Sequence, residues 1–234
     1  GIAVALCDAD GAPPRLVAPG HIWSRLEILD WLEHDLPADT LVGFDLGMGL
    51  PFADSGAFFP GWDASPADAR GLWRLLDHLC DADADLSASS FVDHLEAARH
   101  FRRHRGRTGD RFGSGGGRLR VTEQAQRAQG LNPTSNFNLV GASQVGKSSL
   151  TGMRMLHRLN GHLPVWPFDP RPARGSVLVE IYTSIAAIAS GMAKGRTKMR
   201  DGASLDRALT VLGCAAHAPL PRYTDHATDA ILTA

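Results

Sequence analysis

The stretch LVGFDLGMGLPF, residues 41–52, constrains the fold more than any other part of the sequence. Leu41 and Val42 begin an apolar run that is typical of a buried strand, and the glycines and the proline that follow end it. Asp45 is therefore expected in or at the end of this strand. A carboxylate is costly to bury there unless it caps the next turn, pairs with a base or holds a metal ion. Asp45 is thus a candidate site residue.

Composition limits the classes of protein to which this chain can belong. It has 234 residues, of which 44% are hydrophobic and 21% charged, as in ordinary globular proteins. The net charge is −1, so attraction to nucleic acid must come from local clusters. Cys7, Cys80 and Cys214 lack metal-ligand spacing, which favours a reducing compartment over a structural zinc site. No apolar run reaches the roughly 18 residues of a membrane span. We expect a cytoplasmic protein without a membrane partner, and its oligomeric state is left open.

The order of the predicted elements is that of an α/β protein. Residues 2–6 and 15–18 are predicted to form a hairpin, and a helix with Ser24 as N-cap and Glu27 in a capping box follows. Residues 41–45 form the next strand. Residues 176–182, SVLVEIY, form a buried strand with Glu180 near its end. Helices are predicted over 150–159, 184–192, 205–214 and 224–234, and a short strand over 137–140.

A long insertion separates the strands that carry Asp45 and Glu180. It covers residues 53–138 and contains predicted helices at 66–80 and 90–101. Its segment 99–120 carries eight arginines and one acid, Asp110. This segment is either a surface loop or an arm that binds the phosphates of nucleic acid, because arginine clusters bind phosphate bidentately. The candidate phosphate ligands in it are Arg102, Arg103 and Arg105.

The segment 141–149, GASQVGKSS, matches the P-loop pattern G-x-x-x-x-G-K-[ST]. In such a loop, backbone N–H groups surround phosphates, and Lys147 and Ser148 would contact phosphate and magnesium. The Asp that normally ends a later strand of such folds is absent, and Glu180 is its only substitute. The alternative is a glycine-rich turn that enters a helix.

Acidic residues near the C-terminus complete a second candidate site. Asp225 and Asp229 are four residues apart on the predicted last helix and therefore share a face, with His226 as a neighbour. Asp225 alone is also explained by the preference of helix N-termini for acids. Together with Asp45 and Glu180, however, these carboxylates suit a pair of Mg²⁺ or Mn²⁺ ions that activate water against a phosphodiester.

These segments resemble a known class of proteins. DHATDAILTA is similar to the C-terminal helix of ribonuclease-H-like nucleases of the Holliday-junction-resolvase type. The chain also resembles, over several segments, an uncharacterised family predicted to have that fold. The similar segments are LVGFDLGMGLPF, NLVGASQVGKSSLTGMRML, VWPF, LVEIY and the last helix. The resemblance runs from residue 41 to the C-terminus. In that family the glycine segment generally lacks the lysine, which argues against a P-loop.

The resemblance implies a fold and a set of ligands. The fold is a ribonuclease-H-like domain over residues 1–234, with a mixed five-stranded sheet flanked by helices and the insertion at about 53–138. Metal-ligand roles fall on Asp45, Glu180 and Asp229, with Asp225 or His226 beside them. Such nucleases also carry an Asp on their first strand, which is expected upstream of Gly1 or at Asp8 or Asp10.

The sequence therefore predicts a Mg²⁺- or Mn²⁺-dependent nuclease that hydrolyses phosphodiester bonds in nucleic acid. Two alternatives stay open. One is a P-loop NTPase that binds nucleotide through residues 141–149. The other is a binding module that has the same fold but no catalytic activity.

Overall fold

The computed structural model describes residues 1–9, 12–141, 144–193 and 198–234, and these separate into two compact units. Unit 1 contains residues Gly1–Trp31 and Ile181–Ala234, and unit 2 contains Leu32–Glu180. Helix α1 (Arg25–His34) carries the chain from one unit into the other. The predicted insertion lies entirely in unit 2, and the prediction of a single domain stays a prediction. Each unit is described by itself.

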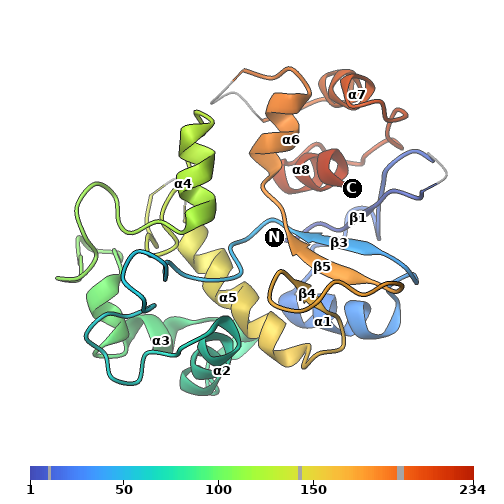
Figure 1. The fold of residues 1–234 in the computed structure, drawn as a ribbon. Coiled ribbons are helices and arrows are strands. Elements are labelled where there is room, and N and C mark those ends of the chain that lie inside the picture. Colours follow the sequence, from blue (N-terminus) through green and yellow to red (C-terminus); the bar gives the residue numbers. More distant parts are fainter. Residues whose placement is uncertain (10–11, 142–143, 194–197) are drawn as a thin grey trace. The chain divides into compact units, whose positions relative to one another are not determined.

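Unit 2 contains a three-stranded parallel sheet in the order β3-β5-β4 (Figure 1). β3 (Leu41–Phe44) pairs with β5 (Val177–Glu180) from Leu41 opposite Val177 to Phe44 opposite Glu180. β4 (Val165–Trp166) pairs with the other side of β5. β5 is the central strand, and its Leu178 is fully buried while its other three residues are partly exposed. The carboxyl ends of all three strands therefore point the same way.

The predicted mixed five-stranded sheet is wrong. The described residues form this three-stranded sheet and a separate two-stranded one, made of β1 (Ala5–Leu6) and β2 (Arg15–Leu16). The strands predicted at 41–45 and 176–182 are present, but at 137–140 there is only a single bridge between Arg102 and Asn138. The reason lies in the sequence NPTSNFN before it, whose polar residues and proline have low strand propensity.

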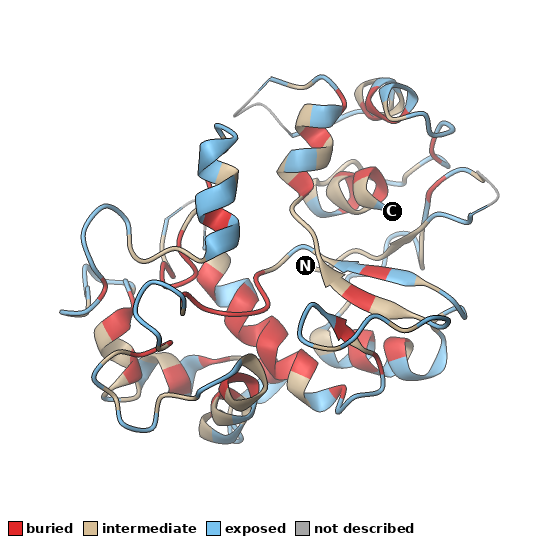
Figure 2. Cartoon of the chain, viewed as in Figure 1, coloured by how far each residue is buried: buried red, intermediate tan, exposed pale blue. Residues whose placement is uncertain are grey.

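Two helices form the centre of unit 2. α2 (Ala69–Leu79) and α5 (Val145–Arg158) lie side by side (Figure 1). Asp68 caps α2 by accepting a hydrogen bond from the Gly71 N–H at 2.7 Å, and the helix buries Leu72, Trp73 and Leu76. α5 is buried continuously from residue 149 to 156, as the red middle of this helix in Figure 2 shows.

The insertion is folded into short elements around an aromatic core. The helix predicted at 66–80 is present as α2, whereas the one predicted at 90–101 is divided into α3 (Ser89–Asp93) and a 3₁₀ helix (Ala97–His100). The division falls at His94, whose backbone is extended. A further 3₁₀ helix (Ala84–Leu86) and α4 (Val121–Ala128) complete the insertion. Its fully buried aromatic side chains are Phe59, Trp73, Phe91, Phe101 and Phe137.

Unit 1 is a helical cluster with a small hairpin. β1 and β2 pair antiparallel, as expected, and α6 (Thr183–Ala189), α7 (Gly202–Val211) and α8 (Asp225–Thr233) surround an aliphatic core. The capping box is confirmed, because the Ser24 N–H donates to Glu27 at 2.7 Å and the Glu27 N–H donates back to the Ser24 hydroxyl at 3.2 Å. Thr224 caps α8 by accepting from the Ala227 N–H.

Two further expectations concern the whole chain. Over the residues that the structure describes, no helix has both the length and the apolar character needed to cross a membrane. Cys7, Cys80 and Cys214 are all free thiols, with Cys80 buried and the other two exposed.

Candidate functional site

Two of the predicted acidic residues lie at the same edge of the unit 2 sheet. Asp45 directly follows Phe44, the last residue of β3, and Glu180 is the last residue of β5. Phe44 and Glu180 are partners in the parallel register, so the two carboxylates belong to adjacent strand ends. Asp45 is exposed, and the Glu180 side chain keeps 26% of its surface accessible. Ligands commonly bind at this edge of parallel sheets.

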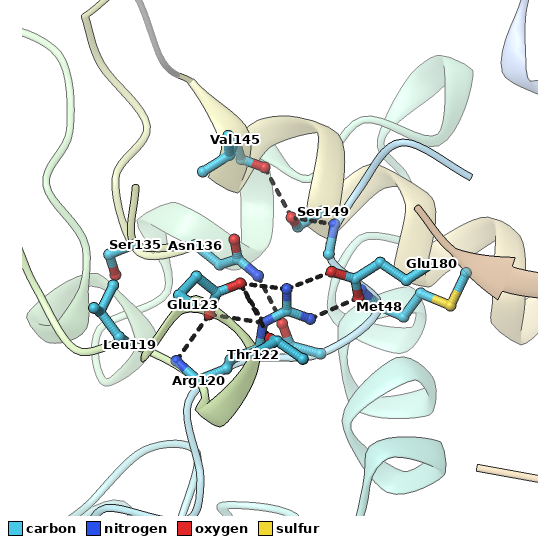
Figure 3. Close-up of polar contacts among 12 residues, drawn as sticks. Met48, Leu119, Arg120, Thr122, Glu123, Ser135, Asn136, Val145, Ser149 and Glu180 are labelled. Atoms are coloured by element: carbon cyan, nitrogen blue, oxygen red, sulfur yellow. Dashed lines mark hydrogen bonds and ion pairs between the residues drawn. The ribbon is translucent and has the colours of Figure 1, made fainter. Parts of the chain in front are cut away.

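A buried arginine neutralises Glu180 (Figure 3). The Arg120 guanidinium donates from Nη1 to Oε2 at 2.7 Å and from Nη2 to Oε1 at 2.5 Å, and the Met48 N–H also donates to Oε2 at 3.0 Å. Arg120 contacts Glu123 as well, through its side chain and through its backbone N–H at 2.8 Å. Burial lowers the pKa of Arg120, but the hydrogen bonds to Glu180 and Glu123 outweigh it, and the net pKa is raised. Arg120 is therefore a fixed cation beside the strand ends.

The loop after Asp45 is held in one conformation by its neighbours. The Gly47 N–H donates to the Ser149 hydroxyl at 3.2 Å, and the Gly49 carbonyl accepts from the Asn136 amide at 2.9 Å. A Cβ at Gly47 would lie 2.2 Å from the Asn136 amide nitrogen, so only glycine fits this close approach. The loop therefore fixes the backbone beside the two carboxylates, and Ser149 connects it to the first turns of α5.

The donor set of this edge suits a hard cation. Both side chains offer carboxylate oxygens, and Mg²⁺ is commonly held by one or two carboxylates together with waters and substrate phosphate. A carboxylate accepts about four hydrogen bonds, and Glu180 uses three of these positions for Arg120 and Met48. One position on Oε1 of Glu180 is therefore left for a further ligand. Asp45 and Glu180 thus offer the type of oxygen ligand that Mg²⁺ and Mn²⁺ prefer, although both oxygens of Glu180 also accept from Arg120.

The other two predicted acids lie in unit 1. Asp225 and Asp229 are on α8, where Arg200 pairs with Asp225 at 2.7 Å and Lys198 pairs with Asp229 at 2.6 Å. His226 is exposed on the same helix. Within the described ranges, no group of three or more His, Cys, Asp or Glu side chains is arranged to hold a metal ion. The convergence of Asp229 or Asp225 with the unit 2 carboxylates stays a prediction.

The first-strand acid that the resemblance requires is not replaced by Asp8. Its carboxylate pairs with Arg15 across the β1–β2 hairpin at 2.7 Å, and both side chains are about half exposed. Asp10 lies outside the described residues. Asp8 therefore pairs within its own hairpin.

Much of the arginine-rich segment pairs with acids of its own unit. Arg99 pairs with Asp110 at 2.7 Å, and Arg103 pairs with Asp93 at 2.7 Å. Arg118 pairs with Asp54 at 2.6 Å and also donates to backbone carbonyls of the loop around it. Arg103, predicted as a phosphate ligand, is instead paired with Asp93, the last residue of α3. Ion pairs therefore tie the segment to its own unit, although only His100, Phe101 and Phe112 of it are buried.

A smaller cationic surface remains around the start of α5. Arg102 and Arg105 are exposed, and over the described ranges neither is paired with an acid. Lys147 is exposed too, and its Nζ lies 2.9 Å from Nε2 of His104. The loop 102–108 is thus placed against the first turn of α5, although Lys147 is far from it in sequence. The contact between His104 and Lys147 brings the loop with Arg102 and Arg105 to the start of α5, and we call these four residues the cationic surface (Arg102, His104, Arg105 and Lys147).

The P-loop-like segment differs from a phosphate-binding loop where it is described. Gly146 lies in the first turn of α5, and a Cβ there would lie 2.4 Å from the Asn136 carbonyl oxygen. The Ser148 hydroxyl donates to the Val145 carbonyl at 3.0 Å. No strand enters the segment over its described part, and residues 142–143 lie outside the description. Nucleotide binding through Lys147 and Ser148 stays a prediction.

Sequence reasoning missed the part that Arg120 and Glu123 play. Arg120 counted only as one member of a basic segment, and its partner Glu180 is 60 residues away. One local signal was present, because Glu123 stands three residues after Arg120, which is the spacing of a capping box. That signal predicts the start of α4 but not the ion pair with β5.

Comparison of the chain with protein-family models, curated proteins and solved structures found no match. The site is therefore interpreted from its own geometry.

Proposed function

We propose that this protein hydrolyses phosphodiester bonds in nucleic acid, with Mg²⁺ or Mn²⁺ held by Asp45 and Glu180. The observation that supports this most is that Asp45 directly follows Phe44, the residue that pairs with Glu180 in the parallel register of β3 and β5. When bound there, the ion would activate water and stabilise the leaving oxygen.

The residues around this edge have supporting roles in the proposal. Arg120 offsets part of the negative charge of Glu180 and Glu123, which reduces the repulsion that the phosphate of a substrate would meet at this edge. The loop 46–50 holds the backbone next to Asp45 in a fixed position through Ser149 and Asn136. Ser149 belongs to α5, whose first turn contributes Lys147 to the cationic surface. Phosphates that follow the cleaved one would contact this surface.

The proposal is tested by cleavage of labelled oligonucleotides with Mg²⁺, with Mn²⁺ and with EDTA. We expect cleavage with either metal, none with EDTA, and a loss of at least a hundredfold in Asp45→Asn. Glu180→Gln should lose activity as well, but it also removes a partner of buried Arg120, so Asp45→Asn decides the question. Asp8→Asn is the matched control, because it removes an exposed acid of unit 1. Full activity in Asp45→Asn would refute the proposal.

A second candidate function is binding of nucleic acid without hydrolysis. The observation in its favour is that Arg120 engages both oxygens of Glu180 and supplies the charge that a metal ion would bring. Oligonucleotide binding with no metal-dependent cleavage, and with binding unchanged in Asp45→Asn, would favour this candidate.

A further inference from the structure

Two aromatic side chains are exposed on the segment that follows β4. Trp166 has 52% of its surface accessible and Phe168 has 40%, although large aromatic side chains are usually buried for most of their area. Arg171 and Arg174 are exposed a few residues later. Within nine residues the segment 166–174 thus presents two aromatic rings and two guanidinium groups.

This segment leaves the sheet at the same edge as Asp45 and Glu180. β4 runs parallel to β5, and Trp166 lies opposite Val179, the residue before Glu180. Phe168 packs edge-on against Trp73 with ring centroids 5.2 Å apart. The Trp73 indole N–H donates to the Met48 carbonyl at 2.8 Å, and the Met48 N–H donates to Glu180. A short series of contacts therefore connects Phe168 to the acidic edge.

Local contacts order the backbone of the turn that carries the two rings. The Asp169 carboxylate accepts from the Val165 N–H at 2.7 Å and pairs with Arg70, and the Asp169 N–H donates to the Val165 carbonyl at 2.8 Å. Pro167 and Pro170 restrict the backbone on either side. Binding to such a turn costs little conformational entropy, because the backbone is already ordered.

The charge of the segment selects the kind of partner. Its acid, Asp169, is neutralised by Arg70, whereas Arg171 and Arg174 are exposed and, as far as the chain is described, have no acidic partner. Exposed rings next to arginines match a single strand of nucleic acid, whose bases stack on the rings while its phosphates meet the cations. A duplex hides the faces of its bases in the stack and cannot make the same contacts.

We propose that Trp166 and Phe168 form a stacking surface for unpaired bases, with Arg171 and Arg174 as phosphate contacts. This inference builds on the proposed function and specifies single-stranded nucleic acid, or an unpaired region, as its substrate.

The test measures binding of labelled oligonucleotides in EDTA, so that no cleavage takes place. Fluorescence anisotropy is recorded with a single strand of about 12 thymidines and with the corresponding duplex. We expect the single strand to bind more tightly, and Trp166→Ala to weaken it about tenfold, as expected for one lost stacked base. The double variant with Arg171→Ala and Arg174→Ala should show a smaller salt dependence of the affinity than the wild type.

The matched control is Leu41→Ala. Leu41 is another large exposed apolar side chain of this sheet, 69% accessible, but it lies at the opposite end of β3. Its loss should leave binding unchanged. Phe168→Leu is a second variant, in which packing against Trp73 is largely kept while the aromatic face is lost.

The outcomes separate this inference from the proposed function. Equal or tighter binding of the duplex, or unchanged single-strand binding in Trp166→Ala, overturns the inference even if the wild type cleaves with Mg²⁺. Single-strand binding that Trp166→Ala weakens, in a protein that never cleaves, supports the inference and refutes the hydrolase. Self-association that depends on Trp166, without an effect on oligonucleotide binding, would assign the surface to a second copy and overturn the inference.

Discussion

Glu180 of unit 2 and Asp229 of unit 1 are paired with cations of different exposure. In unit 2, Glu180 is bound by Arg120, whose side chain is only 14% exposed. In unit 1, Asp229 is bound by Lys198, whose side chain is 50% exposed. Exposed pairs contribute little because water and salt screen them, whereas removing one partner of a buried pair leaves an unsolvated charge. We therefore expect the ion pair of Asp229 with Lys198 to contribute less to the free energy of unfolding than that of Glu180 with Arg120.

The cores of the two units also differ in the side chains that they bury. Unit 1 packs small and aliphatic side chains such as Ala187, Leu205 and Ile231. Unit 2 packs aromatic rings and also buries a charge, because Arg154 is fully buried with its Nε 2.8 Å from Asp77. Unit 2 should therefore depend far more on single polar contacts than unit 1.

The largest effect is expected from Asp77→Ala. The change leaves the Arg154 charge buried without its carboxylate, which should cost about 3–5 kcal/mol of the free energy of unfolding. Urea unfolding measures this loss, and labelling of the buried Cys80 thiol should become faster as unit 2 opens more often. If the Asp77→Ala protein is as stable as the wild type, unit 2 does not depend on its buried polar contacts as proposed.

A smaller effect is expected from acid. Burial of His100, helped by the charges of Arg118, Arg111 and Arg99, lowers its pKa from 6.5 to about 4. The unfolded chain therefore binds the proton first, and unit 2 should lose about 2 kcal/mol of stability between pH 7 and pH 5.

Urea midpoints measured across this pH range test the acid effect. His100→Phe should flatten the pH dependence, because the side chain is buried among aromatic rings. His226→Gln, at an exposed position of unit 1, is the control and should leave the dependence unchanged. If the His100→Phe protein loses stability with falling pH as steeply as the wild type, another titrating group causes the pH dependence.

The smallest effect is expected from Asp229→Ala. Its partner Lys198 is half exposed, so the loss should stay below about 1 kcal/mol. Thermal unfolding at low and high salt measures it, and salt should remove most of the difference from the wild type. A loss as large as that of Asp77→Ala would remove the distinction between buried and exposed pairs.

Sequence reasoning identified local elements better than long-range partners. The apolar runs around Val42 and Leu178 predict the strands correctly, and Ser24 and Thr224 predict helix starts, because these signals depend on neighbouring residues. The number of strands was taken from a resemblance, and the short polar segment at 137–140 could not supply another one.

The candidate site shows the same limit. That Asp45 and Glu180 stand at strand ends follows from their own segments, but their adjacency requires β3 and β5 to pair. The partners of Arg99, Arg103 and Arg118 depend on how the insertion folds, so a basic segment looked like an arm. Trp166 and Phe168 were not among the candidate site residues, because the exposure of their rings cannot be deduced from the sequence.

Binding of Mn²⁺ to the wild type and to Asp45→Asn, followed by the electron paramagnetic resonance signal of the free ion, tests the central claim most directly. The account predicts that the wild type removes Mn²⁺ from solution, that Mg²⁺ displaces it, and that Asp45→Asn binds at least tenfold more weakly while Asp8→Asn is unchanged. Mn²⁺ binding of equal affinity in the wild type and in Asp45→Asn, or no binding in either, would contradict it.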